Sequence, residues 1–228
     1  MRFVTALVTL LCVLCGPLAG FCAQAVPQAA LAHLATLRAV QAEIWPDLPY
    51  PWLLAGQVEQ ETCITLKHSK CWNPRAELKT SLEYGFGLGQ ITKTDKFNNF
   101  EVIKAMDPLL KTWEWQDRYN SKMQVRALVV YDKYIYNIVK KLARDYWNAL
   151  CFMFSAYNGG VGGLNKDIAI CRKVEECDPK VWFGNVAEYS FRAKKPVKGY
   201  GESFFMINRK YVDNVMNVRS EKYKEHMR

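Results

Sequence analysis

The 228-residue chain contains little glycine, proline and charge, with 13 Gly, 9 Pro and 23% charged residues. Neither Gly nor Pro recurs at a fixed interval, which excludes a collagen-like protein, and eight Cys are too few for a small disulfide scaffold. Internal repeats and low-complexity linkers are also absent. Half of the residues are hydrophobic, so the chain has the apolar surface that disordered proteins lack. This length and composition predict one compact domain.

An apolar N-terminal run predicts export from the cytoplasm. Arg2 supplies a positive charge, Val4 to Leu14 are uncharged, and Ala23-Gln24-Ala25 has the small-x-small pattern of a cleavage site. The run is shorter than the roughly 20 apolar residues that span a membrane. Residues 1–25 are therefore predicted to be a signal peptide cleaved near Ala25. Residues 26–228 are then expected to form a periplasmic or secreted domain without stable membrane insertion.

The cysteines that follow the signal peptide predict two disulfides. Cys63 lies close to Cys71 in the sequence, and Cys171 lies close to Cys177. In an oxidising compartment each pair can close a short loop. Zinc binding is the alternative, but no pair has C-x-x-C spacing and the chain has only three His, so no metal site is expected. Cys151 lies in an apolar string and is interpreted as a buried free thiol.

Helical periodicity dominates the chain after residue 26. Apolar residues at helical spacing, with helix start and stop signals, predict helices at 27–43, from about 51, at 121–144, at 145–158 and at about 203–222. Strand-like alternation is sparse, so the predicted fold class is mainly α. Residues 65–90 are polar and contain three glycines, and they are predicted to be a loop with at most one helical turn.

The segment 51–62 offers a candidate general acid. On a helix, Leu54, Val58 and Glu61 share the face that would point to the core, whereas Glu59 falls on another face and is expected to be solvated. A half-buried carboxyl is desolvated, which raises its pKa towards the value that a general acid needs near neutral pH. On this segment alone, a glutamate exposed at the helix end is the better interpretation.

Two later segments look like parts of a ligand site. Three glycines surround Gln90 in the segment Gly85-Phe86-Gly87-Leu88-Gly89-Gln90, which would let the backbone approach a ligand closely. The segment Ala156-Tyr157-Asn158-Gly159 ends an apolar helix with an aromatic ring and an amide. Each signal is weak by itself, because an ordinary loop can have the first sequence pattern and an ordinary helix end can have the second.

Taken in order, five motifs resemble those of the soluble lytic transglycosylases, goose-lysozyme-like enzymes that cut bacterial peptidoglycan. They are Gln60-Glu61-Thr62, Asn73-Pro74-Arg75-Ala76, the glycine-rich segment 85–90, Ala156-Tyr157-Asn158-Gly159 and Tyr211-Val212. The resemblance covers about residues 48–220. It implies a lysozyme-like domain with a substrate cleft, and glycan strands of peptidoglycan as the partner.

The resemblance also implies the roles of particular residues. Glu61 would be the single catalytic acid and base, with no cofactor. The residues that would bind substrate are Gln90, Gly87, Tyr157, Asn158 and Tyr211. The enzyme would cut the β-1,4 bond between N-acetylmuramic acid and N-acetylglucosamine and leave a 1,6-anhydro end. Wall opening for a secretion or conjugation apparatus is one biological use that fits.

This sequence departs from the family pattern in three places. The spacing between Glu61 and Gln90 is longer than is typical, and the insertion holds the Cys63 and Cys71 pair. Gly89 stands where a Met precedes the Gln. Ile207-Asn208 stands where Glu-Thr often precedes the late Tyr. The walls of the saccharide site are therefore expected to differ from those of the family.

Two alternatives stay open. A goose-type muramidase would hydrolyse the same bond, but hydrolysis needs a second carboxyl, and Ser81 and Thr92 stand near the expected aspartate positions. Glu83 is the nearby acid that could serve as that second carboxylate. A non-catalytic cell-wall-binding protein on the same scaffold is the other alternative. The charge of +9 suits acidic envelope polymers, whereas the scattered Lys and Arg do not indicate nucleic-acid binding.

Overall fold

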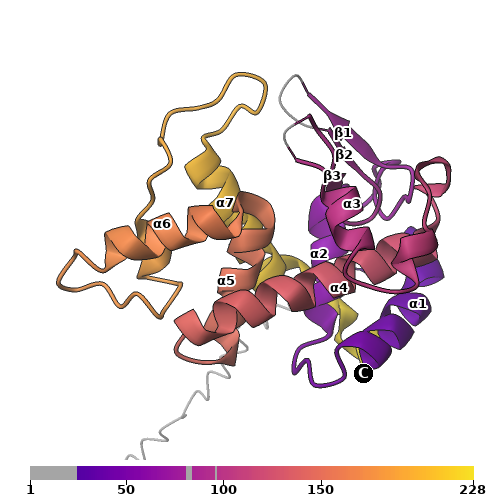
Figure 1. Ribbon diagram of the computed structural model, residues 1–228, viewed down its shortest axis with the longest axis horizontal. Coiled ribbons are helices and arrows are strands. Elements are labelled where there is room, and N and C mark those ends of the chain that lie inside the picture. Colours follow the sequence, from indigo (N-terminus) through magenta and orange to yellow (C-terminus); the bar gives the residue numbers. More distant parts are fainter. Residues whose placement is uncertain (1–24, 81–83, 96) are drawn as a thin grey trace, which may run out of the picture.

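The computed structural model describes residues 25–80, 84–95 and 97–228 (Figure 1). The predicted signal peptide, apart from Ala25, and the candidate second carboxylate Glu83 lie outside these described residues.

Helices make up most of the described chain, which confirms the mainly α class. They are α1 (Gln28–Ile44), α2 (Trp52–Thr62), α3 (Asn99–Lys104), α4 (Ser121–Val139), α5 (Tyr146–Gly159), α6 (Val161–Cys171), α7 (Phe204–Asp213) and α8 (Lys224–Met227). A π-helical segment, η5 (Asn214–Arg219), continues α7. One small antiparallel sheet has the order β1 (Glu77–Lys79), β2 (Tyr84–Phe86) and β3 (Ile91–Thr92).

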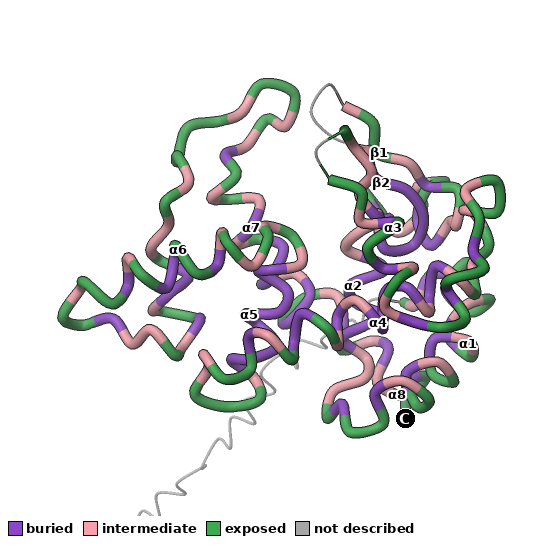
Figure 2. Tube along the Cα trace, in the orientation of Figure 1, coloured by how far each residue is buried: buried purple, intermediate pink, exposed green. Residues whose placement is uncertain are grey.

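The long helix α4 lies at the centre of the packing. It contacts α1 on one side and α5 on another, and buried positions follow α2, α4 and α5 through the middle of the molecule (Figure 2). The main core continues from these helices to α7 and η5. A smaller aromatic core, built around Phe86, Phe100 and Trp113, supports the sheet and α3. In the view of Figure 1, α7 lies at the upper left and the sheet at the upper right, both above α4.

Local sequence signals set the helix ends. The carboxylate of Asp145 accepts a hydrogen bond from the Asn148 backbone N–H at 2.8 Å and caps α5. Ser203 caps α7 in the same way through the Met206 N–H, at 3.1 Å. Both residues are favoured N-caps because a short polar side chain can reach an unpaired N–H of the first turn. At its other end α5 stops before Gly160, which has a φ of 77°.

Most of the predicted helices are confirmed, and one predicted loop is wrong. The helix predicted from Ser121 ends earlier than expected, at Val139, and a short 3-10 turn follows it. The helix predicted at 203–222 changes to π-helical geometry at Asn214. Residues 65–90 hold β1 and β2, which the sequence did not predict, because each strand is only three residues long and too short to show alternation.

Both predicted disulfides are formed. Cys63–Cys71 ties the end of α2 to the loop that leads into β1, and Cys171–Cys177 closes the turn after α6. Cys151 is free and fully buried, as predicted, and burial raises the pKa of its thiol. Disulfides of this kind are typical of proteins in oxidising compartments. Among the described residues, none of the helices is both long and apolar enough to cross a membrane.

Candidate active site

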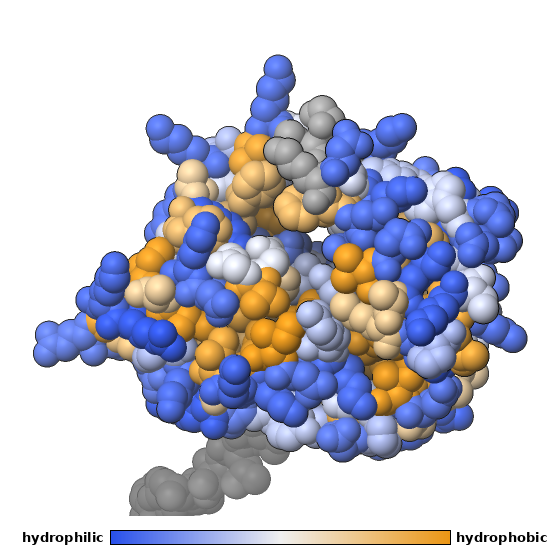
Figure 3. Space-filling model, in the orientation of Figure 1, coloured by the Kyte–Doolittle hydropathy of each residue, from blue (hydrophilic) through white to orange (hydrophobic). Residues whose placement is uncertain are grey.

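Three adjoining cavities form a groove between the sheet and α7, and we call it the central groove. The first, of about 340 Å³, and the second, of about 330 Å³, share Gln60, Glu61, Leu78 and Gln90 as lining residues. The third, of about 460 Å³, is lined by several of the residues that line the second, including Tyr157. Figure 3 shows this face of the molecule hollowed at the same place. The groove passes directly over Glu61.

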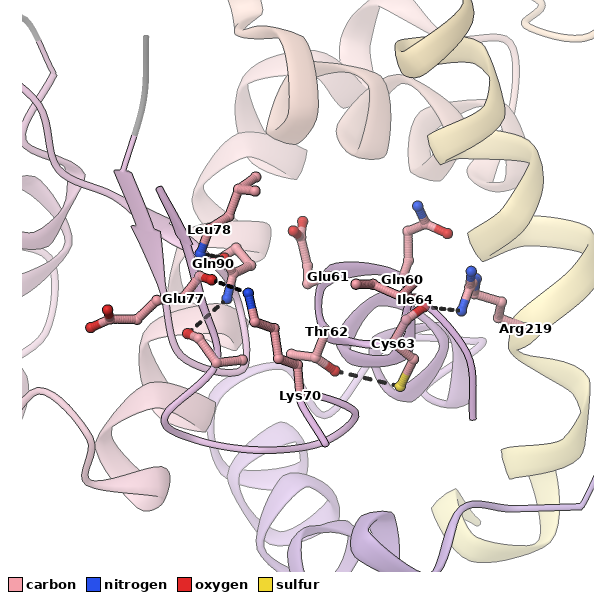
Figure 4. A pocket seen from close by; sticks show the side chains of 11 residues that line it. Gln60, Glu61, Thr62, Cys63, Ile64, Lys70, Glu77, Leu78, Gln90 and Arg219 are labelled. Carbon is pink, nitrogen blue, oxygen red and sulfur yellow. Dashed lines mark hydrogen bonds between the residues drawn. The ribbon is translucent and has the colours of Figure 1, made fainter. Parts of the chain in front are cut away.

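Glu61 lies in the last turn of α2 and is half-buried. Its carboxyl points into the central groove, with Leu78 and Gln90 on one side and Gln60 on the other (Figure 4). The hydroxyl of Tyr211, from α7, donates a hydrogen bond to Glu61 Oε1 at 2.5 Å. The structure thus brings together a carboxyl and a tyrosine that are far apart in the sequence.

Two tyrosines form the wall of the groove next to Glu61. The rings of Tyr157 and Tyr211 are stacked, with centroids 6.3 Å apart and planes 11° apart. Burial raises the pKa of both tyrosines well above the usual value, and the charge of Glu61 raises the pKa of each further. Both hydroxyls are therefore protonated at neutral pH and act as donors. Tyr157 donates to the carbonyl of Gly89 at 2.6 Å.

Replacing Tyr211 with Phe is expected to slow any reaction that depends on Glu61. The variant keeps the stacked ring but loses the donor that holds one carboxyl oxygen. A hydrogen bond to a charged group contributes about 1.5–3 kcal/mol, so turnover should fall by about tenfold to a hundredfold. Turnover on purified peptidoglycan measures this, with Tyr134→Phe as a control on an exposed tyrosine. Unchanged turnover for Tyr211→Phe would show that the hydrogen bond does not serve Glu61.

Gln90 lines the central groove, but backbone atoms already occupy its amide. Its Nε2 donates to the carbonyls of Ala76 and Gly87, at 3.1 and 2.8 Å, and its Oε1 accepts from the Leu78 N–H at 3.1 Å. The residue has a positive φ of 44°, an uncommon conformation for a non-glycine residue. These contacts give Gln90 a structural role, holding β1 to the glycine-rich loop. Its contact with a sugar stays a prediction.

Gly87 is conformationally required and lies outside the set of residues that line the groove in the described chain. It has a φ of 76°, and a Cβ there would lie 2.5 Å from the side chain of Gln124. That buried amide accepts from the Leu88 N–H at 2.9 Å and donates to the carbonyls of Pro74 and Arg118. Gly87 therefore makes room for the side chain that fixes the loop, and its contact with a substrate stays a prediction.

Gly87→Ala is expected to destabilise the protein by about 2–4 kcal/mol, because it combines a strained backbone with a steric clash. Urea unfolding measures the change in the free energy of unfolding. Gly162→Ala is the matched control, since Gly162 lies in α6 and an added Cβ meets nothing within 4 Å. The control should be neutral or stabilising. Equal stability of the two variants would contradict this explanation of Gly87.

Asn158 lines the groove beyond Tyr157, and a buried residue positions it. Its Oδ1 accepts a hydrogen bond from Asn208 Nδ2 at 3.0 Å, and the same nitrogen donates to the carbonyl of Ser155. Asn208 is only 1% exposed. In the sequence, Asn208 was notable only as a departure from the family pattern. In the structure, its hydrogen bond positions the side chain of Asn158.

The far end of the groove depends on a buried ion-pair cluster that the sequence did not reveal. Asp167 is fully buried, and its Oδ2 accepts from Arg192 at 2.8 Å and from Arg209 at 2.9 Å. Arg192 lines the third cavity and also donates to the carbonyl of Gly159, at 2.9 Å. The cluster joins α6, α7 and the end of α5, so it fixes the wall that carries Tyr157 and Tyr211.

The expectation that Glu59 is solvated is wrong. Glu59 is 1% exposed, and it accepts hydrogen bonds from Lys222 at 2.8 Å and from Tyr223 at 2.5 Å. The prediction failed because the C-terminal segment covers the outer face of α2, and no periodicity within α2 reports that contact. Glu61 is thus the acid of α2 that faces the groove, and Glu59 attaches the helix to the rest of the fold.

The described residues include no cluster of three or more His, Cys, Asp or Glu that could hold a metal ion. Thr92 lines the groove, and Ser81 and Glu83 lie outside the described chain.

Comparison with the models of known protein families finds no match to this chain, and comparison with curated proteins finds none either.

Proposed function

We propose that this protein is a peptidoglycan lytic transglycosylase with Glu61 as its single acid and base. The observation that carries the proposal is the half-buried carboxyl of Glu61, which points into the groove and accepts the Tyr211 hydrogen bond. The groove is lined by aromatic and amide side chains, as suits a sugar polymer. The sequence motifs support the same activity through their resemblance to this family.

The proposed reaction uses one carboxyl twice. Because Tyr211 donates to Oε1, the proposed mechanism places the acidic proton of Glu61 on its other carboxyl oxygen. Glu61 donates this proton to the bridging oxygen, the bond from that oxygen to C1 of N-acetylmuramic acid breaks, and the N-acetylglucosamine side leaves as an alcohol. The N-acetyl group of the substrate stabilises the electron-poor C1, as in other substrate-assisted glycosidases.

The second step closes the anhydro ring and regenerates the acid. Ionised Glu61 removes the proton from the C6 hydroxyl of N-acetylmuramic acid, and O6 forms a bond to C1. Atoms balance without water, and Glu61 ends the cycle protonated. In this proposed step the C6 hydroxyl of the substrate is the nucleophile, so no second carboxyl is needed to activate water on the opposite face of the sugar, as it is in an inverting hydrolase. The protein is proposed to act outside the cytoplasm, where its two disulfides would form.

Mass spectrometry of the products tests this function. Mature protein is incubated with purified peptidoglycan, beside the Glu61→Gln variant, and the soluble fragments are analysed. Anhydro-muropeptides from the wild type and none from the variant are expected. Reducing ends would instead identify a muramidase and direct attention to Glu83. Absence of release by either protein would contradict the enzymatic proposal and favour a wall-binding protein.

A further inference from the structure

Behind Glu61, a buried acid and a buried amide face each other in a way that leaves two atoms without partners. Gln57, one helical turn before Glu61 in α2, donates from Nε2 to Asp132 Oδ1 of α4 at 3.2 Å. Both residues are 0% exposed. Gln57 Oε1 and Asp132 Oδ2 have no hydrogen-bond partner. Buried oxygens without partners cost free energy, so a missing donor is indicated.

A proton on Asp132 supplies that donor. An amide and a carboxylic acid can form a cyclic pair with two hydrogen bonds, in which the amide N–H meets the acid carbonyl and the acid O–H meets the amide carbonyl. Here the first bond is already present, and the two partnerless oxygens are the atoms that the second bond would join. If Asp132 were ionised, both of its carboxyl oxygens would be acceptors. The partnerless one would then have no proton to share with the amide oxygen of Gln57, which is also an acceptor.

The surroundings of Asp132 favour the neutral form. The titratable groups that face it are Glu61 from α2, Tyr157 from α5 and Tyr211 from α7, besides Tyr131 of its own helix. Across the part of the chain that the structure describes, no ion pair includes Asp132. Burial raises the pKa of its carboxyl well above the usual value, and the charge of Glu61 raises that pKa further.

We propose that Asp132 is held as an uncharged carboxylic acid, paired with Gln57 through two hydrogen bonds, and that this pair positions the turn of α2 that carries Glu61. Gln57 and Glu61 are four residues apart and share one face of α2, so fixing the Gln57 side chain fixes that face. Asp132 is a positioning residue, because it is not among the residues that line the groove and would act on Glu61 through Gln57. Its link to catalysis rests on the proposed function, whereas its protonation state does not.

The protonation state is tested by unfolding in urea between about pH 5 and about pH 8. Asp132→Asn keeps the shape and supplies the second donor as an N–H, without an ionisable proton. In unfolded wild type, Asp132 loses its proton above about pH 4, whereas the folded protein retains it. Wild-type stability should therefore fall with rising pH relative to the variant, and the ratio of their unfolding equilibrium constants should change about tenfold per pH unit.

Two results of the urea experiment would contradict the protonation of Asp132. A ratio independent of pH, or an Asn variant less stable than wild type at neutral pH, would overturn the proposal. Asp167→Asn is the matched control, since Asp167 is equally buried but is bound by Arg192 and Arg209. That variant should be less stable than wild type at neutral pH, because two guanidinium groups lose their charged partner.

Two further measurements separate structure from catalysis. In a Glu61→Gln background, infrared spectroscopy at neutral pH should show the carbonyl stretch of a protonated carboxyl that disappears with Asp132→Asn; absence of this band in the parent would overturn the proposal. On peptidoglycan, Asp132→Ala should lower kcat about tenfold to a hundredfold with KM little changed, and Asp132→Asn should restore it. Equal kcat for both variants would overturn the positioning role.

If wild type cleaves nothing, the proposed function fails. Urea unfolding and infrared spectroscopy still decide the protonation state of Asp132.

Discussion

Glu61→Gln is expected to lower peptidoglycan cleavage by about 10²- to 10⁴-fold, the usual contribution of a general acid. The substitution keeps the size of the side chain and an oxygen that can accept the Tyr211 hydrogen bond, so the fold should be retained. It removes both the proton that Glu61 donates in the first proposed step and the carboxylate that accepts the C6 hydroxyl proton in the second. The measurement is the rate at which soluble fragments are released from purified peptidoglycan, beside the thermal unfolding of both proteins.

Glu176→Gln is the control for this experiment, because Glu176 is an exposed acid in the loop closed by the second disulfide. It should cleave at the wild-type rate. A Glu61→Gln protein that is fully folded and equally active would exclude Glu61 as the acid. A Glu61→Gln protein that still binds the insoluble wall would show that binding and cleavage are separable.

Asp167→Ala is expected to destabilise the protein by about 3–5 kcal/mol, the largest stability loss that we predict. The side chains of Arg192 and Arg209 are only 9% and 11% exposed, so each guanidinium would keep its charge in a poorly hydrated place without its carboxylate. The Ser190 hydroxyl and the Phe191 N–H would also lose the acceptor that they share. Urea unfolding at neutral pH measures the loss.

Glu202→Ala is the matched control, because Glu202 forms an ion pair with Lys210 in which both side chains are well exposed. Exposed pairs contribute little, so this variant should lie within about 1 kcal/mol of wild type. A small effect of Asp167→Ala, close to that of the control, would show that the two arginines find other partners. The wall that carries Tyr211 would then not depend on the cluster.

Local sequence patterns predicted those parts of the fold that are determined within a single segment of the chain, namely the long helices and the short disulfide loops. Helical spacing and N-caps such as Asp145 and Ser203 identified the long helices, because these signals are local to each helix. The short spacing of Cys63 and Cys71 predicted their disulfide for the same reason. The sheet was missed, because its strands of two or three residues are stabilised by the aromatic core beneath them rather than by their own sequence.

The candidate site was predicted only in part, for a related reason. Motifs identified Glu61, Tyr157 and Tyr211, and the structure places all three along the central groove. The residues that hold them were not predictable, because a single Asp132 or Asp167 has no local pattern that distinguishes a buried partner from a solvated side chain. Their contacts join helices that are distant in the sequence, and only the tertiary packing defines them.

The hydrogen bond between Tyr211 and Glu61 means that the site is complete only when α2 and α7 have both formed and packed together. The two residues are separated by 150 positions, and the segment that supplies Tyr211 continues into the residues that cover Glu59. A growing or incompletely folded chain can form α2 well before α7 reaches it. Until then Glu61 lacks its donor and the groove lacks a wall. If the protein does cut the cell wall, this order of events keeps partly folded chains inactive.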